Sequence, residues 1–133
     1  MRRGRRDPLG PRGERVAARY LRRRGYRVLG CNLETHFGEA DLLCQSRRDR
    51  AIVLVEVKAR RGSAGPPPEA SVTHGKRQRL ERILEHLVRT NGWHDRPRRI
   101  DVVAIAFERR RWLPARARVR HFEDAVAAGG GTR

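Results

Sequence analysis

The stretch Gly38-Glu39-Ala40-Asp41 is followed, 15 residues after its aspartate, by Glu56-Val57-Lys58 inside an apolar run. Both segments alternate in the period of two that is typical of β-strands. The four residues Arg47–Arg50 lie between them and suit a short hairpin loop. We therefore expect two antiparallel neighbouring strands, Glu39–Gln45 and Ala51–Ala59.

The loop length predicts which residues face each other across this hairpin. If Ser46 pairs with Ala51, then Asp41 lies opposite Glu56 and Glu39 lies opposite Lys58. These four charged residues share one face, whose loop end is apolar. The other face is apolar throughout and carries Ala40, Leu42, Val53, Val55 and Val57. A sheet that is apolar on both faces is covered on both faces, so the charges are expected where the cover ends, in a cleft.

Two opposed carboxylates are the chemically informative part of this cluster. Like charges that face each other destabilise a sheet, so Asp41 and Glu56 need a cation. Mg²⁺ (or Mn²⁺) suits them, because Mg²⁺ takes one or two carboxylates together with waters and phosphate oxygens. The alternative is a structural salt-bridge cluster in which Glu39 pairs with Lys58 and Asp41 bonds to the backbone.

Lysine usage sharpens the interpretation of this strand. Of 32 basic residues only Lys58 and Lys76 are lysine, so the chain supplies its general positive charge as arginine. Lys58 could therefore orient an attacking water or neutralise charge that develops on a phosphate. Lys76 lies four residues before Leu80, so it is expected to point inward, where it could meet a phosphate; as a first-turn residue it could equally extend to water.

The remaining pattern predicts one α/β domain with a mixed central sheet flanked by helices. Residues 1–12 are expected to form a disordered basic arm, 13–128 the domain, and 129–133 a disordered glycine tail. Gly62–Glu69 breaks all periodicity and indicates an exposed loop. The other expected elements are a helix over Gly13–Arg24, a strand over Tyr26–Asn32, a helix over Gly75–Arg89, a strand over Ile100–Phe107 and a short strand over Val119–Phe122.

The formal net charge of +17 favours a polyanionic partner, with nucleic acid ahead of an acidic membrane. The alternative is an arginine-rich composition without a partner. Trp93 and Trp112 lie among arginines, which suits base stacking, although core packing is the commoner role of tryptophan. No membrane-length apolar run or signal peptide is evident, so a cytoplasmic protein is expected. The expected nucleic-acid contacts are Arg60, Arg61, Arg77, Arg98 and Arg99.

These residues resemble the PD-(D/E)XK nuclease superfamily, and more closely the YraN-like family of uncharacterised bacterial proteins. That family is similar to archaeal Holliday junction resolvases and to the tRNA-endonuclease-like fold. The resemblance implies a restriction-endonuclease-like αβββαβ core and covers nearly the whole chain. The proline that usually precedes the motif's aspartate is absent, and Ala40 stands in its place. The matching stretches include Gly13-Glu14, Gly38–Leu42, Val55–Arg60, Lys76 with Leu80, Arg99–Ile105, and His121 with Phe122.

The resemblance also implies roles for individual residues. Those matching Asp41 and Glu56 bind the metal, with the carbonyl of Val57 assisting, and the residue matching Lys58 supports catalysis. In the resolvases a glutamate that matches Glu14 completes the site. By itself, Glu14 could equally be a first-turn residue favoured by the helix dipole.

Three further residues form a second tier of candidates, Glu39, Lys76 and Asp101. Asp101 lies at the start of its strand. It could be a partner to the metal ligands or an aspartate exposed to solvent, and both alternatives stay open. The leading hypothesis is an endonuclease of branched or structured nucleic acid that depends on Mg²⁺, with DNA ahead of RNA. The alternatives are a nucleic-acid-binding module that keeps the fold without cutting, and a protein-interaction domain. By analogy with resolvases, which are dimers, a homodimer is one alternative, and a monomer is the other.

Overall fold

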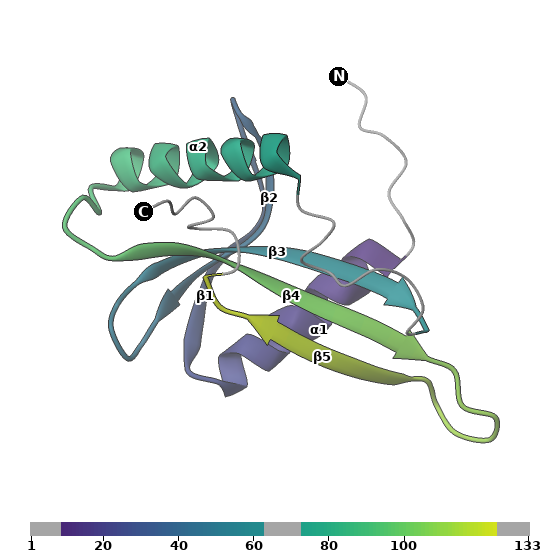
Figure 1. Cartoon of the computed structure of the whole chain (residues 1–133). Coiled ribbons are helices and arrows are strands. Elements are labelled where there is room, and N and C mark those ends of the chain that lie inside the picture. The colour runs from purple at the N-terminus through teal and green to yellow at the C-terminus, as the bar shows by residue number, and fades with distance from the viewer. Residues whose placement is uncertain (1–8, 63–72, 125–133) are drawn as a thin grey trace.

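Every expected helix and strand is present in the computed structural model, which describes residues 9–62 and 73–124. Together they confirm an α/β domain with a mixed sheet and two helices (Figure 1). The elements are α1 (Leu9–Arg23), β1 (Tyr26–Thr35), β2 (Gly38–Ser46), β3 (Ile52–Arg61), α2 (His74–Asn91), β4 (Arg98–Glu108) and β5 (Arg116–Phe122).

The five strands lie in the order β1-β2-β3-β4-β5. The first three form an antiparallel meander, β4 runs parallel to β3, and β5 returns antiparallel to β4. A parallel neighbour needs a crossover connection, and α2 supplies it between β3 and β4. Strand β3 therefore lies at the centre of the sheet.

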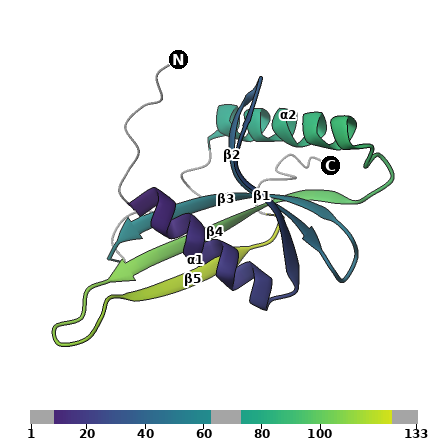
Figure 2. The ribbon, with the colours of Figure 1, turned by 180° about the vertical axis from the view of Figure 1, so that it is seen from behind.

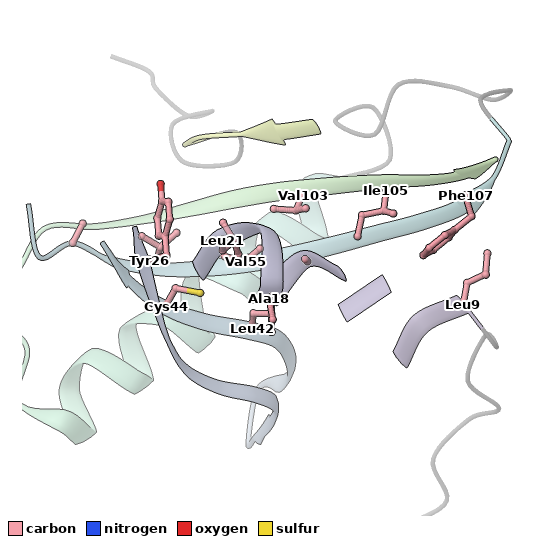
Figure 3. Close-up of a cluster of buried hydrophobic side chains, with 13 residues drawn as sticks. Leu9, Ala18, Leu21, Tyr26, Leu42, Cys44, Val55, Val103, Ile105 and Phe107 are labelled. Atoms are coloured by element: carbon pink, nitrogen blue, oxygen red, sulfur yellow. The ribbon is translucent and has the colours of Figure 1, made fainter. Parts of the chain in front are cut away.

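The helices cover opposite faces of the sheet, as the two views in Figures 1 and 2 show. On one face, Leu21 of α1 packs in a cluster with residues of β2, β3 and β4 (Figure 3). On the other face, Leu80 and Ile83 of α2 pack against Leu54 of β3 and Val102 of β4. Because both faces are covered, β3 is buried continuously from Ile52 to Glu56 and does not alternate with polar residues there.

The start of the first helix differs from the expectation. The predicted disordered arm over residues 1–12 is wrong for residues 9–12, since α1 begins at Leu9, whose side chain is buried. Pro11 is compatible with this because a first helical turn needs no backbone donor there. Arg12 then lies over the ring of Phe107, 4.5 Å from its centroid.

Residues 1–8, 63–72 and 125–133 lie outside the described residues. They include most of the predicted loop over Gly62–Glu69 and the whole predicted tail. In the part of the chain that the structure describes, no helix is long and apolar enough to span a membrane.

A glycine sets how closely α1 approaches the sheet. A Cβ atom added to Gly13 would lie 2.8 Å from the Cβ of Ala59 on β3 and 3.7 Å from a methyl group of Val57. The Ala59 methyl is attached directly to the backbone and cannot rotate away. Gly13 thus allows the close packing that brings the next residue, Glu14, to the sheet.

Gly13→Ala is expected to lower the free energy of unfolding by about 1–2 kcal/mol, since overpacking outweighs the helix-propensity gain of up to about 1 kcal/mol. Gly75→Ala is the matched control, because Gly75 lies on α2 with nothing within 4 Å of its added Cβ. That control should be neutral or slightly stabilising. Chemical denaturation measures both, and Ala59→Gly should restore part of the loss. Equal effects at the two glycines would contradict the close-packing argument.

Candidate active site

Strands β2 and β3 separate at Asp41. Their paired register runs from Gln45 opposite Ile52 to Leu42 opposite Val55. The Ser46 N–H donates to the carbonyl of Ala51 at 2.9 Å and closes the loop end. This confirms the predicted hairpin register. The ladder stops just before Asp41, so the expected pairs of Asp41 with Glu56 and of Glu39 with Lys58 are not part of it, and Glu39 pairs with Glu34 of β1.

The side chain of Asp41 takes the place of a backbone partner at this separation. Its Oδ2 accepts a hydrogen bond from the backbone N–H of Val57 at 2.7 Å. The regular alternation of β2 also breaks here. Ala40 packs in the cluster under α2, so its predicted position on the same face as Leu42 is wrong. The physical reason is that β2 leaves the plane of the sheet once its ladder with β3 ends.

Both lysines of the chain converge on one buried carboxylate. Glu56 is 8% exposed, and its Oε2 lies 2.5 Å from Lys76 Nζ and 3.5 Å from Lys58 Nζ. In a chain with 30 arginines among its 32 basic residues, this convergence is not explained by general surface charge.

The two lysines reach Glu56 from different elements. Lys58 lies two residues further along β3 and so on the same face of the strand. Lys76 lies in the first turn of α2, where its backbone N–H donates to the side chain of the N-cap residue Thr73 at 3.1 Å. The cap fixes the start of α2 and hence the point from which Lys76 extends to the sheet.

The surroundings shift the pKa values of this cluster. Burial, and next the charge of Glu56, raise the pKa of Asp41 to about 7, against the hydrogen bond from Val57. Burial, and next the ammonium group of Lys76, lower the pKa of Lys58. Burial would also lower the pKa of Lys76, but its hydrogen bonds, the one to Glu56 foremost, and the nearby carboxylates outweigh this and raise it. Shifted pKa values of this kind are typical of functional sites, although ion-pair networks produce them too.

A third carboxylate lies close to the pair. Glu14 is buried on α1 beside Gly13, and its charge contributes to the raised pKa of Asp41. The structure therefore brings together the four residues singled out for catalysis and one of the second tier. They are Glu14, Asp41, Glu56, Lys58 and Lys76.

The other predicted residues lie elsewhere. Glu39 is exposed and lies opposite Glu34 on the neighbouring strand β1. Arg60 and Arg61 end β3, and the Arg77 guanidinium lies 3.1 Å from the His74 ring on α2. Arg98 pairs with Glu85 of α2 at 2.7 Å, so this guanidinium holds the helix to β4.

Asp101 forms a separate network on the opposite face of the sheet. It is fully buried and accepts hydrogen bonds from Arg99 Nε at 3.0 Å and from the Asp124 N–H at 2.8 Å, while His121 Nε2 lies 2.8 Å away. Arg99 also donates to the hydroxyl of Tyr26 at 2.6 Å. Burial works to lower the pKa of Arg99, but Asp101 outweighs it and raises that pKa.

Sequence patterns did not reveal this network. Its members come from β1, β4 and β5 and from the residues after β5, and these segments are far apart in the sequence, although Arg99 is only two residues from Asp101. A pocket of about 420 Å³ opens beside it, and its lining includes Tyr26, His121 and three arginines but none of the residues around Glu56. The network joins the residues that follow β5 to the sheet, and Arg99 is engaged inside the protein.

The carboxylates around Asp41 supply some of the ligands that a divalent cation needs. Two carboxylates, with Glu14 nearby, supply the oxygen donors that Mg²⁺ prefers. Across residues 9–62 and 73–124, no group of three or more His, Cys, Asp or Glu side chains has the geometry to hold a metal. An ion held by Asp41 and Glu56 would therefore need water and substrate for its other ligands, and it would have to displace Lys76, whose Nζ lies 2.5 Å from Glu56 Oε2.

The element order, the β3–α2–β4 crossover and the charged cluster at the separation of β2 from β3 define an α/β protein with a restriction-endonuclease-like core. The chain belongs to the uncharacterised protein family UPF0102, whose model matches residues 13–105. This confirms the YraN-like resemblance.

Similar proteins carry the same family name, UPF0102 protein. One from Roseiflexus castenholzii is 42% identical over 107 residues, covering 77% of this chain and 82% of the relative. One from Geotalea uraniireducens is 37% identical over 117 residues, covering 88% and 87%. One from Anaeromyxobacter dehalogenans is 35% identical over 125 residues, covering 94% and 88%. The family name states no activity, so an activity has to be argued from the site.

Proposed function

We propose that this protein binds nucleic acid and is an endonuclease, dependent on Mg²⁺ or Mn²⁺, that hydrolyses phosphodiesters in branched or structured DNA. The observation that carries the proposal is the convergence of both lysines on Glu56, beside the carboxylate of Asp41. Opposite charges gathered where the ladder between β2 and β3 ends can hold a cation and a phosphate at once. The resemblance to the resolvases supports DNA as the substrate.

Each residue of the cluster has a proposed part. Asp41 and Glu56 would hold the cation, and Glu14 would add negative charge from α1. Bound Mg²⁺ would polarise a phosphoryl oxygen and lower the pKa of a water molecule. Lys58 would orient that water or donate to a phosphate oxygen as its charge grows. Lys76, released from Glu56, would pair with a phosphate of the strand.

The alternative is a nucleic-acid-binding module that keeps the fold without cutting. One observation favours it: Lys76 already neutralises Glu56 at 2.5 Å, as a structural ion pair would. The two functions share the positive surface and differ only in whether the cluster reacts. Under both, affinity should fall steeply with salt, with a log–log slope of about −0.9 for each phosphate neutralised on duplex DNA. A flat salt dependence would contradict both.

The decisive experiment is a cleavage panel. The purified protein is incubated with labelled four-way junctions, flaps, single strands, duplexes and structured RNA, with Mg²⁺, with Mn²⁺ or with EDTA. We expect cleavage of a branched or structured DNA that requires a metal ion and is lost in Asp41→Asn. That variant, purified in parallel, detects a contaminating nuclease, since contaminating activity would survive in it. Binding without cleavage under every condition would favour the non-catalytic module.

A further inference from the structure

The two tryptophans of the chain have opposite environments. Trp93 packs against the apolar cluster beneath α2. Trp112 lies between β4 and β5 with 84% of its surface exposed, and the next residue, Leu113, is 59% exposed. Figure 1 shows the β4–β5 connection extending beyond the rest of the sheet. A large apolar ring at such a tip contributes little to the core and is available to a partner.

The turn between β4 and β5 is held by a hydrogen bond and is basic. Residues 109–115 contain three arginines and no acidic residue, and Arg116, Arg118 and Arg120 follow on β5, where Arg118 pairs with Glu108 at 3.1 Å. Arg110 Nε donates to the carbonyl of Pro114 at 3.0 Å and closes the turn. The guanidinium of Arg111 lies 5.4 Å from the centroid of the Trp112 ring. The turn thus presents an aromatic face surrounded by positive charge.

An exposed indole with arginines around it fits single-stranded nucleic acid. Every base has a π-face on which an aromatic side chain can stack, and arginines bind the adjoining phosphates. Charge complementarity favours a polyanion, and a stacking surface distinguishes unpaired bases from a duplex, whose bases are already stacked on each other. The partner that fits is therefore a strand with unpaired bases, as at a junction or a flap.

The distance from the tip to the carboxylate cluster suits one continuous strand. Lys58 pairs with Ala104 in the β3–β4 ladder, and Trp112 follows Ala104 by eight residues. At about 3.3 Å per residue, the tip lies at most about 26 Å from that pair. This is roughly the length of eight nucleotides at about 3.4 Å each.

We propose that Trp112 is a base-stacking site that holds an unpaired nucleotide while the flanking arginines hold its phosphates. This rests on the proposed binding of nucleic acid and does not require cleavage. The stacking contact selects substrates with unpaired bases and sets where the strand lies relative to Lys58.

The test measures binding in EDTA, so that no strand is cut. Labelled single strands of about 12 nucleotides and a four-way junction are titrated with the full chain and with Trp112→Ala, Trp112→Phe and Leu113→Ala. Trp112→Ala should weaken binding to single strands by roughly 5- to 150-fold, and Trp112→Phe by less because it keeps a ring. Leu113→Ala is the matched control: it removes exposed apolar surface at the same tip but no π-face, and should change affinity less than Trp112→Ala does.

A second readout follows the indole itself. The difference in tryptophan emission between wild type and Trp112→Phe isolates Trp112 and leaves Trp93 in place. Single strands should quench this difference signal, whereas vesicles that contain phosphatidylserine should not change it. A response to vesicles alone would overturn the proposal in favour of a membrane surface.

The outcomes also separate this proposal from the function on which it rests. Unchanged affinity in Trp112→Ala, with the wild type still binding in a salt-dependent way, would overturn the stacking site alone. Failure of the wild type to bind any nucleic acid would overturn both.

Discussion

Asp41→Asn is expected to stabilise the metal-free protein above neutral pH. Burial and Glu56 raise the pKa of Asp41 from 3.8 to about 7, so the folded protein binds this proton more tightly than the unfolded chain does. The wild type should therefore lose stability as pH rises from about 4 to about 7, and no further above that. The amide can still accept the hydrogen bond from Val57 and carries no charge. The gap between variant and wild type should widen over this range to the order of 2–4 kcal/mol.

Metal ions should reverse the order. Mg²⁺ or Mn²⁺ that binds only the folded wild type stabilises it by mass action, by about 2.7 kcal/mol at a hundredfold excess over Kd. Asp41→Asn should lose most of that gain and still bind nucleic acid. Thermal melts with EDTA and with metal, over a pH series, measure both effects.

The control is Asp95→Asn, the same chemical change at an exposed turn residue. It should alter neither the pH dependence nor the response to metal. If Asp41 instead anchors a structural network, its substitution should cost on the order of 1–3 kcal/mol at every pH. A destabilised variant together with a wild type that does not respond to metal would contradict the proposed active site.

Lys58→Arg is expected to reduce cleavage by roughly 10²- to 10³-fold, the usual loss when one group that stabilises a developing charge is removed. Lys58 Nζ lies 3.5 Å from Glu56 Oε2, with Lys76 on the same oxygen. A guanidinium is longer and planar and would bind the carboxylate with two hydrogen bonds, so it cannot act as a compact donor to water or phosphate. Folding and affinity should be nearly unchanged because the charge is kept.

Single-turnover cleavage and binding in EDTA separate these effects. Arg82→Lys, the reverse exchange at an exposed position of α2, is the control and should leave the cleavage rate at the wild-type level. Full activity in Lys58→Arg would mean that Lys58 supplies only general positive charge.

The sequence by itself determined the local structure and the register of the central hairpin. A four-residue loop and a period of two specify which residues face each other, and both signals lie within neighbouring residues. The pairing of Leu42 with Val55 followed from them. The resemblance to a known family, carried by Asp41, Glu56 and Lys58, was also readable without coordinates.

Local patterns failed where two environments have the same sequence signature. A tryptophan among arginines can pack against the core or extend into solvent. Trp93 packs against the core because of the position of α2, and Trp112 lies in solvent because of the position of the β4–β5 turn. Arg98 and Arg99 read as surface cations, but Glu85 and Asp101 engage them within the fold. Their partners are set by tertiary packing.

Tertiary structure alone also decided what surrounds Glu56. Lys76 is 20 residues away along the chain, and the β3–α2–β4 crossover brings it to the same oxygen as Lys58. The side chain of Asp41, and not its backbone, bonds to Val57 of β3, because the backbone ladder between β2 and β3 has ended at that point. Contacts between distant segments depend on how helices pack on both faces of the sheet, and a periodic pattern within one segment contains no information about that packing.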